Sequence, residues 1–199
     1  MTGGILADSE IHAAIACGDI EIDPYEPAHV NPVSIDLTLG DQVLIYLDWV
    51  SVHNDATYLM ACDPVGPGFD VRNVPRTQSL RIGESGFLLK PGIGYLMHTR
   101  ERIHTKKYVS IIDGKSSLGR LFLQVHFTAG YGDVGFNGQY TLEVSVLHPL
   151  RIYAGMKIAQ MRFHTVVGEV EKLYEGNYTG NDAHGPVASK AYKQFKGAP

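Results

Sequence analysis

The chain has 199 residues, of which 44% are hydrophobic and 19% charged, so it is long enough to fold around a sizeable core. Its net charge of −4 and pI near 6.1 argue against a general nucleic-acid binder, which needs a basic face. Two cysteines, Cys17 and Cys62, without a CxxC motif exclude a disulfide framework.

The N-terminal residues, MTGGILADSEIH, carry no basic region followed by an apolar core. No apolar run in the chain approaches the ~20 residues of a membrane span. We therefore expect a cytoplasmic protein without a membrane segment. Residues 8–17 predict a short helix, with Asp8 or Ser9 as its cap and Gly18 at its end.

After this helix the sequence predicts mainly strands. Ser34–Leu39 alternates apolar and polar residues, and Gln42–Val52 is a second candidate strand. Residues 53–80 are rich in Pro, Gly, Asp and Asn and indicate loops. Gly86–Lys90 and Tyr95–Thr99, on either side of a Pro-Gly turn, predict a hairpin-like pair.

The later strands are expected at Lys107–Ile112, Leu121–Thr128, Tyr140–Val146 and Lys157–Val167. Short strands separated by Gly/Pro turns are typical of an all-β barrel or jelly roll. The periodicity ends at Gly168. We expect a single domain over residues 1–199, in which residues 168–199 form a flexible tail.

Gly114–Arg120, GKSSLGR, opens with a glycine and gathers two hydroxyls and two cations at the start of the most informative stretch. Backbone amides beside a glycine, serine hydroxyls and cations are the groups that bind phosphate. The spacing is not that of a Walker motif, and an ordinary turn with exposed cations explains the same residues equally well.

Two carboxylates follow this stretch. Asp133 lies in the glycine-rich turn GYGDVGFNG, where glycines permit close backbone approach, although without further context an ordinary surface turn is the better explanation. Glu143 lies on a strand, a position where Glu is uncommon. If its face turned inward, partial desolvation would raise its pKa toward that of a general base; the alternative is a solvent-facing residue.

The nine histidines form no HxxxH or HxH motif, and neither the zinc-deaminase signature nor GxSxG is present. The sequence therefore predicts no zinc site and no serine nucleophile. His126 shares a predicted strand face with Gln124 and Thr128, and we interpret it as an internal, hydrogen-bonded histidine.

In serial order the segments ILADSEI, GDIEIDPYEP, NPVSIDLTLG, GFLLKPG, IDGKSSLGRLFL, TAGYGDVGFNGQYTLEV and AGMKIAQM resemble the dCTP deaminase family, which shares its fold with the trimeric dUTPases. The resemblance covers most of the chain. It implies a distorted jelly-roll homotrimer with active sites between subunits, and zinc-independent deamination of dCTP.

The resemblance also implies roles for individual residues. Glu143 would be the general acid/base that activates water for attack on C4 of cytosine. Ser116 and the carbonyl of Ala129 would position that water, and Arg120 would orient the catalytic groups and the phosphates. Substrate binding would fall to Lys115, Ser117, Gln160 and Tyr174 at the phosphates, Asp133 at the sugar, Thr141 and Leu142 at the base through their backbone, and Thr128 beside them.

The same resemblance implies Mg²⁺ bound through the nucleotide phosphates, with no ligand from protein side chains, and dTTP as an inhibitor. Some family members stop at dUTP, whereas others also release diphosphate. Gly130, followed by Tyr131, favours the second kind. A dUTPase without deaminase activity and an inactive nucleotide-binding homologue are the alternatives.

The tail departs from the family pattern. Asn177 stands where a phosphate-binding Lys is expected, and Asn181 stands where a Gln is expected. Losing a full charge from a phosphate contact is worth ~1.5–3 kcal/mol. Either His184 or Lys190 compensates, or fewer phosphates are bound, so triphosphate and monophosphate substrates both stay open.

Overall fold

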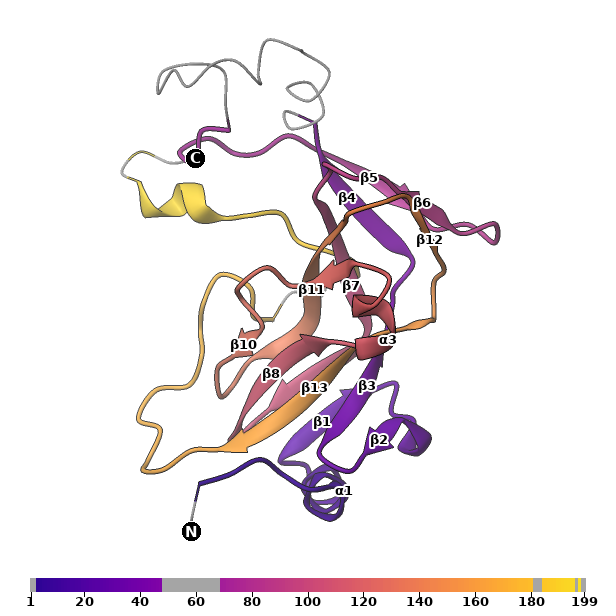
Figure 1. Ribbon diagram of the computed structural model, residues 1–199. Helices are drawn as coiled ribbons and strands as arrows, with labels where there is room; N and C mark the ends of the chain where they lie inside the picture. The colour runs from indigo at the N-terminus through magenta and orange to yellow at the C-terminus, as the bar shows by residue number, and fades with distance from the viewer. Residues whose placement is uncertain (1–2, 48–68, 181–183, 196, 198–199) are drawn as a thin grey trace.

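The computed structural model describes residues 3–47, 69–180, 184–195 and 197 (Figure 1). The first sheet contains, in spatial order, β5 (Thr77–Arg81), β4 (Gln42–Tyr46), β7 (Tyr95–Thr105), β11 (Asn137–Val146) and β9 (Leu123–Val125). β1 (Ile20–Asp23) pairs with the second half of β7, beyond the part that β4 contacts. β7 is therefore the central strand of this sheet.

The second sheet contains β10 (Tyr131–Gly132), β8 (Tyr108–Gly114), β13 (Lys157–Thr165), β3 (Ser34–Thr38) and β2 (Val30–Asn31), and a separate two-stranded ribbon joins β12 (Leu150–Ile152) to β6 (Phe87–Leu89). The paired strands are all antiparallel, as the register of each pair shows. The predicted all-β, jelly-roll type of fold is confirmed.

One hydrophobic core contains apolar side chains from both sheets. Leu37 and Ile158 from the second sheet and Met97, Ile103 and Leu142 from the first have no exposed surface. Each side chain of this size contributes about 1.5–3 kcal/mol when it is fully buried. The core therefore holds the two sheets face to face and leaves the outer face of β11 free to build a site.

The helical elements are short. α1 (Asp8–Ala16) confirms the predicted helix, and Gly18 ends it with a φ of 78°. The predicted cap was wrong, because the N-cap is Ala7 and no side chain caps the helix. The others are η1 (Pro27–His29), α3 (Ser116–Gly119) and η3 (Ala191–Gln194). No helix of the described residues is long and apolar enough to cross a membrane.

The predicted hairpin over residues 86–99 was wrong. β6 pairs with β12, whereas β7 pairs with β1, β4 and β11, so the turn at Pro91-Gly92 carries the chain from one sheet to another. A local turn signal does not reveal this, because the long β7 pairs with strands that are distant in the sequence. Loops were expected over residues 53–80, but Thr77–Arg81 forms β5; residues 53–68, like the end of the candidate strand Gln42–Val52, lie outside the described residues.

The strand expected at Leu121–Thr128 is reduced to three residues, Leu123–Val125. Phe122 and His126 on either side have φ values of 54° and 58°, which is uncommon for residues other than glycine. These two positions end the strand at both ends. The side chains of Leu121, Phe122 and Phe127 consequently lie on the surface instead of in the core.

Candidate active site

A cavity of about 430 Å³ opens on the outer face of the first sheet. Its wall comes from β4, β7 and β11, from the chain between β9 and β11, and from the C-terminal tail, which passes beside β10 in Figure 1. The lining residues are Tyr46, Leu96, His126, Ala129, Tyr131, Gly132, Asp133, Phe136, Gln139, Tyr140, Thr141, Glu143, Tyr174, Tyr178, Gly185, Val187 and Ser189.

Strand alternation along β11 brings Glu143 into this cavity. Tyr140, Leu142 and Val144 are buried in the core, whereas Thr141 and Glu143 on the opposite face are half-buried. The predicted face of Glu143 is therefore correct. Leu142, expected to contact the base through its backbone, has a fully buried side chain that does not line the cavity.

His126 holds the carboxylate of Glu143. Its Nδ1 lies 2.5 Å from Oε2 of Glu143, and its backbone N–H donates to the Glu143 carbonyl at 2.9 Å. Only 6% of the His126 side chain is exposed, and its Nε2 is buried without a hydrogen-bond partner among the described residues. The internal, hydrogen-bonded histidine predicted from the sequence is confirmed, and its partner is the proposed catalytic carboxylate.

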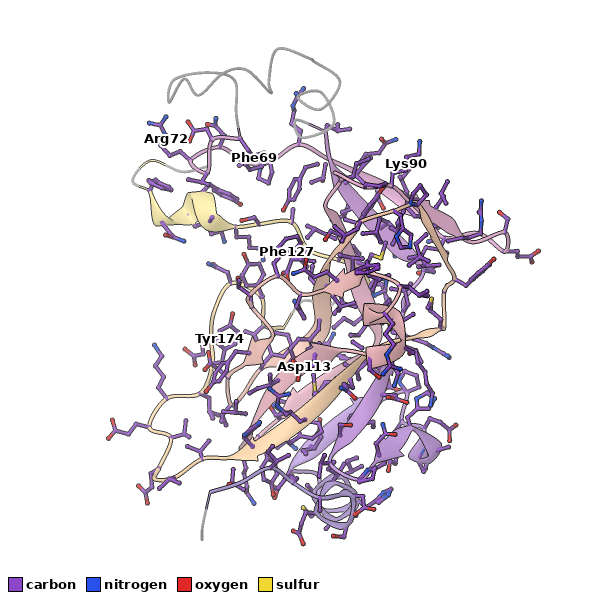
Figure 2. All side chains as sticks on the ribbon, viewed as in Figure 1. Phe69, Arg72, Lys90, Asp113, Phe127 and Tyr174 are labelled. Atoms are coloured by element: carbon purple, nitrogen blue, oxygen red, sulfur yellow. The ribbon has the colours of Figure 1, made fainter. Side chains whose placement is uncertain are left out.

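Asp133, Ala129 and Tyr174 line the same cavity. Tyr174 comes from the tail, as Figure 2 shows, and its backbone N–H donates to the carbonyl of Val134 at 2.9 Å. Thr128 does not line this cavity; it lines a neighbouring depression with Asp113 and Phe127, which shares His126 and Tyr131 with the cavity wall.

The glycines around Asp133 are there because the chain packs closely. A Cβ on Gly132 would lie 2.3 Å from the hydroxyls of both Ser110 and Tyr140, and one on Gly130 would lie 2.4 Å from the carbonyl oxygen of Ile112. Ser110 and Tyr140 hydrogen-bond to each other at 2.6 Å, and burial raises the pKa of Tyr140. The phenol therefore stays neutral and serves as a fixed part of the cavity wall.

The tail is attached to the cavity rim by its backbone. The N–H groups of Gly185, Val187 and Ser189 donate to the side chains of Gln139, Thr141 and Tyr46, at 3.1, 2.9 and 3.0 Å. Burial raises the pKa of Tyr46, so its hydroxyl remains a neutral acceptor. These tail residues, with Tyr46, Gln139 and Tyr178, are cavity residues that sequence reasoning did not identify.

The segment Gly114–Arg120 lies elsewhere. After β8 the chain makes the single turn α3, and Ser116, Ser117 and Arg120 are exposed. None of residues 114–120 lines the cavity. The structure thus divides most of the expected site residues into two sets on one chain: Glu143, Ala129, Asp133, Thr141 and Tyr174 around the cavity, and Lys115, Ser116, Ser117 and Arg120 outside it. Thr128, Leu142 and Gln160 also do not line the cavity.

Asp36 fixes this segment from the inside. Its carboxylate is 4% exposed and ion paired with Lys115 and with Lys157, the latter at 2.9 Å. Gln160 donates from Nε2 to the carbonyl of Gly114 at 3.3 Å. Lys115 and Gln160, both expected at the phosphates, therefore hold the loop to the second sheet. Alternation along Ser34–Leu39 does not reveal this, because both faces of β3 are buried.

No group of three or more His, Cys, Asp or Glu side chains is gathered as a metal site in the part of the chain that the structure describes. Asp133 and Glu143 are the carboxylates of the cavity wall.

Comparison with known proteins identifies the family. A sequence model of the dCTP deaminase-like family matches residues 5–166. The chain is 38% identical over 192 residues to a protein of Leptospira biflexa named "dCTP deaminase, dUMP-forming", covering 96% of this chain and 98% of that protein. Proteins of the same name from Clostridium acetobutylicum and Cytophaga hutchinsonii are also 38% identical, covering 89% and 96% of this chain and 91% and 99% of theirs.

Among solved structures, the fold is similar to that of 2′-deoxycytidine 5′-triphosphate deaminase from Agrobacterium tumefaciens, with a TM-score of 0.60 and 24% identity. The match covers 83% of this chain and 49% of that one, so this chain corresponds to about half of the Agrobacterium chain. The family match and the curated relatives extend over most of the sequence. This chain therefore belongs to the dCTP deaminase-like family.

Proposed function

We propose that this protein deaminates dCTP at C4 of cytosine and hydrolyses the resulting nucleotide to dUMP and diphosphate. The observation that carries the proposal is the carboxylate of Glu143, which lines the cavity and is hydrogen-bonded to His126. The relatives of this chain named dUMP-forming dCTP deaminases support the choice of substrate and product.

In the first step one water adds to C4 and ammonia leaves. Glu143 takes one proton from the attacking water and passes it to N3 of the cytosine ring. It then takes the proton of the new C4 hydroxyl and passes it to the amino group, which leaves as ammonia while C4 becomes a carbonyl. His126 occupies Oε2 of Glu143, and Oε1 has no hydrogen-bond partner among the described residues, so Oε1 is available to the water. The carbonyl of Ala129, in the same cavity, is assigned to orient that water.

In the second step another water hydrolyses the bond between the α- and β-phosphates, so that dCTP and two waters give dUMP, diphosphate and ammonia. Asp133 is assigned to the sugar, and the backbone of Thr141 and Leu142 to the base. Phosphate oxygens are suitable ligands for Mg²⁺, and the described residues of the cavity include no cluster of carboxylates to hold the ion independently. When bound, the ion would screen the negative charge of the phosphates.

The second set of residues is assigned to a neighbouring subunit. Ser116 and Arg120 lie outside the cavity of their own chain, next to the exposed apolar side chains of Leu121 and Phe122. An exposed apolar patch of this kind is typical of a protein interface. In the homotrimer that we propose, these residues would reach the phosphates and the water in the cavity of the adjacent copy.

A product assay tests the proposal. The protein is incubated with Mg²⁺ and, separately, with dCTP, dCMP and dUTP; ammonia is quantified and the nucleotides are resolved by chromatography. Ammonia, dUMP and diphosphate from dCTP are expected. Cleavage of dUTP without ammonia from dCTP would identify a dUTPase instead, and binding without turnover would identify an inactive homologue. Adding dTTP to the same assay tests the expected inhibition.

A further inference from the structure

The wall of the cavity has the wrong charge for a nucleoside triphosphate. It contains the carboxylates of Asp133 and Glu143, and among the residues that the structure describes no Lys or Arg lines it. Phosphate groups are bound in proteins by cations and by N–H or O–H donors. The protein cations that neutralise the phosphates together with Mg²⁺ must therefore come from beyond these lining residues, either from a neighbouring copy or from the edge of the tail.

Lys190 lies at that edge. It follows Ser189, which lines the cavity, and its backbone N–H donates to the hydroxyl of Tyr178, also a lining residue, at 3.0 Å. Its Nζ lies 5.4 Å from the centre of the Tyr178 ring and donates to the backbone carbonyl of Asn177 at 2.5 Å. Two contacts with lining or neighbouring residues thus place this ammonium beside the cavity.

The partners of Lys190 are neutral, which distinguishes it from the paired lysines of the chain. Lys106, Lys107 and Lys115 each form an ion pair with a carboxylate, whereas Lys190 has no carboxylate partner within 4.0 Å among the described residues. A carbonyl and an aromatic face orient an ammonium without cancelling its charge. Lys190 therefore keeps a full positive charge available to an anion.

The contact between Lys190 and Asn177 also accounts for the missing cation at position 177 of the tail. Asn177 lacks the ammonium expected at that position, and Lys190 brings one to its backbone from 13 residues later in the sequence. The other candidate, His184, is exposed and interacts electrostatically with His98. We propose that Lys190 binds the phosphates of the nucleotide and replaces, in space, the cation that is missing at Asn177. This inference rests on the proposed function.

Lys190→Gln tests the inference, with Lys193→Gln as the matched control. Lys193 lies three residues later on η3, is exposed, and forms no ion pair among the described residues. Ammonia release from dCTP is first measured for the wild-type protein. Dissociation constants for dCTP and dCMP with Mg²⁺ are then measured by calorimetry in a Glu143→Gln background, which prevents turnover.

We expect Lys190→Gln to weaken dCTP binding about tenfold or more, as for loss of a charge-assisted hydrogen bond, and to weaken dCMP binding much less. Lys193→Gln should leave both constants unchanged, and Lys190→Arg should retain most of the affinity for dCTP. Adding Asn177→Lys to Lys190→Gln should restore dCTP binding, because the new ammonium starts from the residue that Lys190 contacts.

Equal losses for dCTP and dCMP would mean that Lys190 only orders the tail, and would overturn the inference. Unchanged dCTP binding in Lys190→Gln would overturn it as well, while the proposed function would stand. Absence of ammonia release by the wild-type protein is a separate result; it would overturn the proposed function and this inference together.

Discussion

The cavity wall and the Gly114–Arg120 loop carry the residues that we expect to act on the nucleotide, and they are built in opposite ways. The carboxylate of Glu143 is hydrogen-bonded to His126 and lies in a cavity formed by β4, β7, β11, the chain between β9 and β11, and the C-terminal tail. The loop is held from the inside by Asp36 and Gln160, and Ser116 and Arg120 extend from it into solvent.

This difference shows that one chain encloses a carboxylate in a cavity and, separately, exposes hydroxyls and a cation on its surface. An acidic cavity whose described lining contains no Lys or Arg does not complete a triphosphate site alone. We therefore propose that the cavity wall and the loop are two half-sites on one chain, and a change in either should impair its own half.

Glu143→Gln should have the largest effect. It removes the proton acceptor but keeps the shape of the side chain, so deamination should fall by about a thousandfold or more while dCTP still binds. Ammonia release and calorimetry measure the two effects. Glu169→Gln, an exposed tail residue, is the control. A rate within tenfold of the wild type would remove Glu143 from the mechanism.

Mixing two inactive variants should recover activity if the half-sites come from different copies. Arg120→Ala impairs the loop and Glu143→Gln impairs the cavity. After co-refolding in equal amounts, one site in about four should combine two intact halves in a symmetric oligomer. We expect the mixture to recover about a quarter of the wild-type deaminase activity. No recovery, with mixed oligomers shown by mass spectrometry, would place both halves in a single chain.

Asp36→Asn should weaken the ion pairs that attach the Gly114–Arg120 loop to the second sheet. Two partly exposed lysines would lose a buried carboxylate, at a cost of about 2–3 kcal/mol in the free energy of unfolding. Asp113→Asn is the control, because it breaks a more exposed pair with Arg162, near the middle of the molecule in Figure 2, and should cost about 0–1 kcal/mol. Urea unfolding of both variants measures the difference.

The effect of Asp36 should also depend on pH. Burial acts to raise the pKa of Asp36, but hydrogen bonds from Lys115 and Lys157 outweigh it and leave the pKa below its ordinary value of 3.8. The stabilisation is therefore present above that value and is lost as the pH falls through the lower, folded-state pKa. The difference in free energy of unfolding between the wild type and Asp36→Asn should be constant near neutral pH and should become smaller below about pH 4.

Tyr46→Phe should have the smallest effect. It removes the acceptor for the backbone N–H of Ser189, which costs about 1 kcal/mol in attachment of the tail. Limited proteolysis should cut the tail several-fold faster, while the melting temperature of the sheets hardly changes. An unchanged cleavage rate would show that this hydrogen bond does not hold the tail in solution.

The sequence allowed much of the first half-site to be predicted. Alternation along 140–146 placed Glu143 opposite the core, and the glycines around Asp133 indicated close backbone approach, which Gly132 shows against Ser110 and Tyr140. Such local rules work where one face of a strand is buried and the other is not. They failed for the hairpin expected over residues 86–99, because its strands pair with segments far away in sequence.

The second half-site was harder to predict. The residues of GKSSLGR indicated an anion-binding loop, but its anchorage to Asp36 depends on a polar side chain facing inward from a strand buried on both faces. Attachment of the tail was also not visible in the sequence, since its donors are backbone N–H groups that every residue except proline carries. Roles for residues of either half in substrate binding stay predictions.

The alternation of the tail contacts has a consequence for how freely this segment can change. Gly185, Val187 and Ser189 donate through the main chain, whereas Pro186 and Ala188 between them do not take part. From Pro186 to Ser189 the rim of the cavity thus recognises the course of the backbone and not the identity of the side chains. Substitutions there can diversify what the cavity presents to a nucleotide without detaching the segment, except for a proline at position 187 or 189. Gly185 is different, because its φ of 119° and a Cβ position 2.7 Å from Gln42 restrict it to glycine.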